Sequence, residues 1–104
     1  MSNEPVSEQY RVLAEEWCDA ESAASLLEDT KSAILSQMIL EVGGTAINRA
    51  EAQVKAAPRW IDHLEKINRA RTHANKLKVR LEYLKMKFWE NQSGEASKRA
   101  EMRL

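Results

Sequence analysis

The residues best suited to chemistry lie in the stretch KLKVRLEYLKMKFWE, residues 76–90, where basic side chains outnumber acidic ones and Tyr83, Phe88 and Trp89 are interspersed. Cations neutralise phosphates and aromatic rings stack on bases, so this mixture is typical of a nucleic-acid surface. It equally suits a helix that packs against an acidic partner helix. The candidates for phosphate contact are Arg69, Lys76, Arg80, Lys87, Lys98 and Arg99.

Other reactive side chains do not form a catalytic pattern. Cys18 is the only cysteine, and His63 and His73 are ten residues apart, so they share no metal-ligand spacing with it. The segment EVGGTA lacks the glycine and lysine spacing that holds phosphates. The sequence therefore predicts a protein that is not an enzyme, with no catalytic residue, metal ligand or cofactor.

The elements that carry these residues are predicted to be helical. Apolar residues alternate in steps of four and three from Val6 to Met38, which is the period of a coiled-coil seam. We expect a first helix over about residues 5–42, ended by a turn at Gly43 and Gly44, since glycine readily adopts the left-handed conformation of a helix end.

The second arm, about residues 45–91, contains two apolar registers that meet between Leu64 and Ile67, where a step of three replaces a step of four. The first register places Ile61 on the seam. Because Pro58 disfavours helix at the residue before it, we expect a kink or a break there, and the pattern permits either one kinked helix or a separate short helix. Gly94 predicts a helix end near Asn91, followed by a short helical tail over residues 92–104.

Charge is separated along the chain, although its net value is zero. Residues 1–42 hold nine acidic and two basic residues, whereas residues 43–104 hold fourteen basic and seven acidic ones. In heptad terms, Glu16, Glu21 and Glu28 flank the first seam, and basic residues such as Arg71 flank the second. These complementary flanks predict an all-α, coiled-coil-like antiparallel hairpin within a single domain, residues 1–104.

A two-helix seam leaves apolar residues uncovered, so we expect the hairpin to form a homodimer. The interface candidates are Tyr83, Met86, Phe88, Trp89, Leu35 and Ile39. The lone cysteine and the absence of a long apolar run predict a protein of the cytoplasm without a membrane span.

The run ANKLKVRLEYLKMKFWENQSGEASKRAEMRL, residues 74–104, resembles small coiled-coil proteins of unassigned function encoded in early, often recombination, gene regions of bacteriophages and prophages. Trp89 and the residues Arg99 to Met102 are the most distinctive positions. The resemblance implies a phage accessory protein that acts inside the bacterial host cell, and it implies no catalytic residue or ligand.

Three functions follow as hypotheses. The first is binding to a phage or host protein of the DNA recombination, replication or defence machinery through helical surfaces. The second is direct nucleic-acid binding along the basic face of the second arm. In the third, the acidic first helix occupies and inhibits the nucleic-acid site of a host enzyme.

Overall fold

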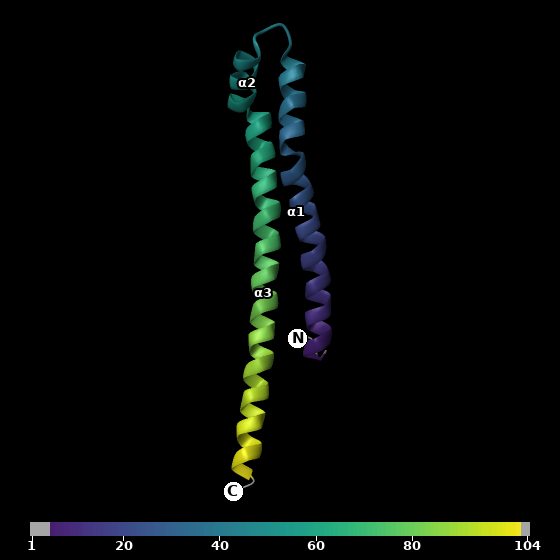
Figure 1. The fold of residues 1–104 in the computed structure, drawn as a ribbon, viewed down its shortest axis with the longest axis vertical. Coiled ribbons are helices and arrows are strands. Elements are labelled where there is room, and N and C mark those ends of the chain that lie inside the picture. The colour runs from purple at the N-terminus through teal and green to yellow at the C-terminus, as the bar shows by residue number, and fades with distance from the viewer. Residues whose placement is uncertain (1–4, 103–104) are drawn as a thin grey trace. The chain divides into compact units, whose positions relative to one another are not determined.

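The computed structural model describes residues 5–102, with side chains for residues 5–95. Figure 1 shows three helices within this range: α1 (Val6–Val42), α2 (Ile47–Ala56) and α3 (Pro58–Met102). No strand is present in residues 5–102. The prediction of an all-α chain is therefore confirmed, and α1 has the bounds that its apolar period indicated.

The turn after α1 is made by two glycines. Gly43 and Gly44 have φ angles of 56° and 69°, in the left-handed region that side chains with a Cβ avoid. Among the described residues no other residue has a positive φ. The predicted turn is therefore confirmed.

The second arm is broken at Ala57, so α2 is a separate helix. Ala57 is extended, with φ −76° and ψ 140°, as expected for a residue whose helical conformation is disfavoured by a following proline ring. The Ala57 carbonyl accepts the backbone N–H groups of Trp60 (3.1 Å) and Ile61 (3.3 Å). Ala57 thus caps α3, and Pro58 occupies its first turn, where a missing N–H costs little.

The prediction of a helix end near Asn91 is wrong. Helix α3 continues through Gly94 to Met102, and Gly94 does not adopt a positive φ. A glycine inside a helix costs only about 1 kcal/mol relative to alanine. The flanking Glu, Ala, Lys and Arg residues favour helix strongly enough for the backbone to continue.

The chain divides into two compact units, each built from parts of the long helices. The turn unit is Ala20–Ala74, and the terminal unit combines Met1–Asp19 with Asn75–Leu104. The expectation of one domain stays a prediction.

The core of the turn unit is a cluster of Met38 from α1, Val54 from α2 and Trp60 from α3. Trp60 is only 4% exposed, whereas Ile61 is 45% exposed, so the placement of Ile61 on the seam is wrong. Because the chain is broken at Ala57, the rotation of α3 about its axis is not set by α2. The buried side of α3 includes Trp60, Leu64 and Ile67, which follow one another in steps of four and three. The irregular step in the sequence pattern is therefore absent from α3.

Ion pairs join α1 to α3 within the turn unit. Arg59 Nη1 lies 2.7 Å from Glu41 Oε2, and Arg71 Nη1 lies 2.5 Å from Glu21 Oε2. Along α1, Glu41 comes after Glu21. Along α3, the partner of Glu41, Arg59, comes before the partner of Glu21, Arg71. The two helices therefore run in opposite directions within this unit.

Candidate interaction surface

The terminal unit carries an apolar groove between the first turns of α1 and a late segment of α3. We call it the Phe88 groove. Its volume is about 340 Å³, and its lining residues are Val6, Ser7 and Tyr10 from α1 and Leu84, Lys85, Phe88 and Trp89 from α3. Lys85 is the one charged residue among them, so the groove suits an apolar group that has an acidic neighbour.

The groove forms because the two helices contribute unequal lengths. Residues 6–19 of α1 face a stretch of α3, residues 75–102, that is about twice as long. Leu77 and Leu81 are buried and Leu84 is half-buried, whereas every described position from Lys85 to Glu95 is exposed. Burial on α3 therefore stops near Leu84, and the apolar residues beyond it remain accessible.

Large apolar side chains are concentrated in this part of α3. Tyr83, Met86, Phe88 and Trp89 are 58%, 61%, 43% and 60% exposed, respectively. The Phe88 and Trp89 rings meet edge to face, with centroids 5.8 Å apart and planes at 73°. Aromatic and methionine side chains are enriched at protein interfaces, and four within seven residues make an unusual surface for a solvated helix.

The structure brings only some of the predicted interface residues together. Phe88 and Trp89 line the groove, while Tyr83 and Met86 are exposed nearby in sequence on α3. Leu35 and Ile39 belong to the turn unit, where they are half-buried against the Met38, Val54 and Trp60 cluster. In that position they contribute to packing in their own unit.

Sequence reasoning missed Val6 and Tyr10 as groove residues. Both fall on the apolar period of the first helix, with Tyr10 one step of four after Val6, yet both remain exposed. The available signal was their place at the start of α1, where a seam has few neighbours on one side.

The nucleic-acid candidates are also distributed over both units. Lys76, Arg80 and Lys87 are exposed on α3 in the terminal unit, and Arg69 is exposed in the turn unit. Lys98 and Arg99 lie outside the residues whose side chains are described. The Lys87 Nζ atom lies 5.7 Å from the centroid of the Tyr83 ring, a cation–π distance.

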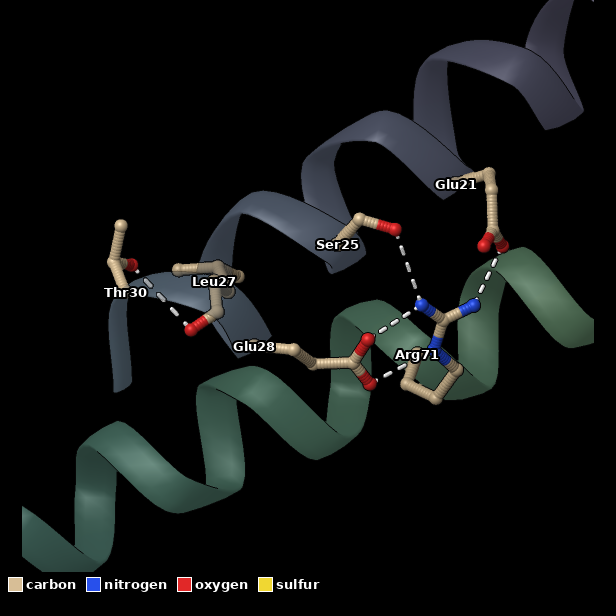
Figure 2. A network of polar contacts seen from close by, with 6 residues as sticks. All are labelled: Glu21, Ser25, Leu27, Glu28, Thr30 and Arg71. Atoms are coloured by element: carbon tan, nitrogen blue, oxygen red, sulfur yellow. Dashed lines mark hydrogen bonds and ion pairs between the residues drawn. The ribbon is translucent and has the colours of Figure 1, made fainter. Parts of the chain in front are cut away.

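Arg71 of α3 is the centre of a polar network with α1, which Figure 2 shows. Its guanidinium donates to Glu28 (Nη2 to Oε1, 2.6 Å; Nε to Oε2, 2.9 Å) and to Glu21 (Nη1 to Oε2, 2.5 Å). The charge complementarity expected from the sequence is thus present at Glu21 and Glu28. Among the described side chains, Glu16 makes no such pair.

These contacts favour the charged forms of both partners. The hydrogen bond from Arg71 lowers the pKa of Glu28 below its ordinary value; burial opposes it as the second-largest effect, and the positive charge of Arg71 adds a smaller lowering. In return, hydrogen bonds to Glu28 and Glu21 raise the pKa of Arg71. The network therefore joins α1 to α3 in the turn unit, and the guanidinium of Arg71 is paired with carboxylates of the same chain.

Groups with catalytic potential do not converge in the described part of the chain. Cys18 is exposed, and the His63 ring packs against Trp60 with centroids 5.8 Å apart. Across the residues that the structure describes, no three His, Cys, Asp or Glu side chains come together as metal ligands would. None of the described helices has both the length and the apolar character needed to cross a bilayer.

No protein-family model, curated protein or solved structure matches the chain.

Proposed function

We propose that this chain is a non-enzymatic interaction protein that binds an amphipathic helix of another protein in the Phe88 groove. The observation that carries the proposal is the exposure of Phe88 and Trp89 beside an apolar groove. Helix-in-groove recognition uses apolar anchors at helical spacing, and buried aromatic residues contribute much of the affinity. Lys85 selects a partner helix with an acidic residue next to its apolar anchors.

The resemblance of residues 74–104 to phage coiled-coil proteins supports a partner in the phage or in its bacterial host. We place the proposed complex in the host cytoplasm, within the DNA recombination, replication or defence machinery. The proposal includes an antiparallel helical hairpin and a homodimer, because uncovered apolar residues remain on both α1 and α3.

The test is affinity capture from phage-infected and uninfected bacteria, followed by titration of the captured protein with purified chain. A Phe88→Ala and Trp89→Ala double variant should lose the partner and weaken the measured affinity by at least about tenfold, as expected for interface anchors. Val79→Ala is the matched control, since Val79 is exposed on α3 but does not line the groove.

The result that contradicts the proposal is equal binding by the double variant and the control. Light scattering tests the homodimer separately. A stable monomer that still binds the partner would refute the proposed homodimer but not the proposed binding in the Phe88 groove.

A further inference from the structure

A row of three exposed cations and one exposed tyrosine follows one side of α3 within the terminal unit. The row consists of Lys76, Arg80, Tyr83 and Lys87, which succeed one another in steps of four, three and four. Residues at these steps lie on the same side of a helix. All four are exposed, and no acidic residue stands between them at this spacing, while Glu90 follows Lys87 at the next step of three. At 1.5 Å per residue the row extends over about 16 Å of helix.

The cations of the row take no part in ion pairs among the described side chains, and Lys87 contacts only the Tyr83 ring of the row itself. Arg11, Arg59 and Arg71 each form ion pairs with glutamates. By contrast, Lys76, Arg80 and Lys87 form no ion pair with any described side chain. Their positive charges are therefore available for an external partner.

Two acidic residues of α1 in the terminal unit, Glu8 and Glu15, are paired with Arg11. Arg11 Nη1 lies 2.8 Å from Glu15 Oε1 and also pairs with Glu8. Salt screens charges beyond about 8 Å at physiological ionic strength, so a ligand on the row interacts mainly with the charges nearest to it.

Tyr83 gives the row a second chemical property. Its ring is 58% exposed and has the Lys87 ammonium 5.7 Å from its centroid. Exposed aromatic rings set among cations serve as stacking platforms for unpaired bases, whereas the bases of a duplex are already stacked on one another. The combination therefore favours a single strand over a duplex.

We propose that this row binds single-stranded nucleic acid, with Lys76, Arg80 and Lys87 contacting phosphates and Tyr83 stacking on a base. This activity is additional to the Phe88 groove, because none of the four residues lines that groove. Three phosphate contacts predict a slope of about −2 for the logarithm of affinity against the logarithm of salt concentration. Affinity should fall about twentyfold between 50 and 200 mM salt.

The experiment measures fluorescence anisotropy of a labelled 20-nucleotide mixed-sequence single-stranded DNA titrated with the full chain at several salt concentrations. Arg80→Gln with Lys87→Gln should weaken binding at least about tenfold at 50 mM salt and reduce the slope to about −0.7. Tyr83→Leu should weaken binding about fivefold or more while leaving the slope unchanged.

The matched control is Lys66→Gln with Lys78→Gln, which removes the same charge from α3 at two exposed positions outside both the row and the Phe88 groove and should retain most of the affinity. Absence of binding at 50 mM salt would overturn the proposal. Equal weakening by both double variants would also overturn it, because net charge alone would then explain the binding. Tighter binding to the corresponding duplex would refute the stacking role of Tyr83 and with it the single-strand assignment.

Discussion

Replacing Trp60 with alanine should be among the most destabilising single substitutions in this chain. A tryptophan buries about 150–250 Å², and at about 25 cal/mol per Å² this area corresponds to an upper estimate of about 4–6 kcal/mol. Trp60 is 4% exposed, but it also lines a groove of about 230 Å³ that gives water access to the vacated space. We therefore expect Trp60→Ala to lower the free energy of unfolding by about 3–4 kcal/mol.

The assay is urea unfolding followed by circular dichroism at 222 nm. With an m-value of about 1.5 kcal/mol/M, the Trp60→Ala midpoint should fall by about 2–2.7 M. Trp89→Ala is the matched control on the same helix, and because Trp89 is 60% exposed its change should stay within about 0.5 kcal/mol. If both variants lost less than about 1 kcal/mol, Trp60 would not belong to the core and the packing argument would be refuted.

Two further predictions concern the ion-pair network and the glycines. Arg71→Met should lower the midpoint of thermal unfolding at pH 7. The difference in midpoint between the variant and the native chain should shrink as the pH falls below 4.5, the ordinary pKa of a glutamate carboxyl group. The pKa of Glu28 is depressed in the folded chain, so its stabilising contribution is present above that value and is lost as the carboxylate takes up a proton; a difference that stayed constant with pH would contradict this. Gly43→Ala should lower the free energy of unfolding by about 1–2 kcal/mol because its φ is 56°. Gly94→Ala should raise it by about 0.5–1 kcal/mol, because Gly94 is inside α3 and the space that its Cβ would occupy is open. Urea unfolding checks both glycine variants, and a change of the same sign in both would contradict the conformational argument.

The candidate surface was predictable in part. Aromatic residues near the end of a basic segment indicated Phe88 and Trp89, because their types are common at interfaces and the seam has few partners there. The place of Val6 and Tyr10 at the start of α1 indicated that they could be exposed, but not that they would line a groove with Phe88 and Trp89, since that depends on where the first turns of α1 meet α3. Leu35 and Ile39 were equally apolar in the pattern, yet α2 and Trp60 provide the surface against which they pack.

The sequence by itself determined the helical class, the bounds of α1, the turn at Gly43 and the interruption before Pro58. Each of these depends on local chemistry: the apolar period, the freedom of glycine at positive φ and the steric effect of a proline ring. Only the tertiary structure decided that Trp60 is buried in place of Ile61, since the break at Ala57 sets the rotational phase of α3 independently of α2. It likewise decided how far burial continues along α3, because a seam residue such as Phe88 is covered only where another helix is present to pack against it.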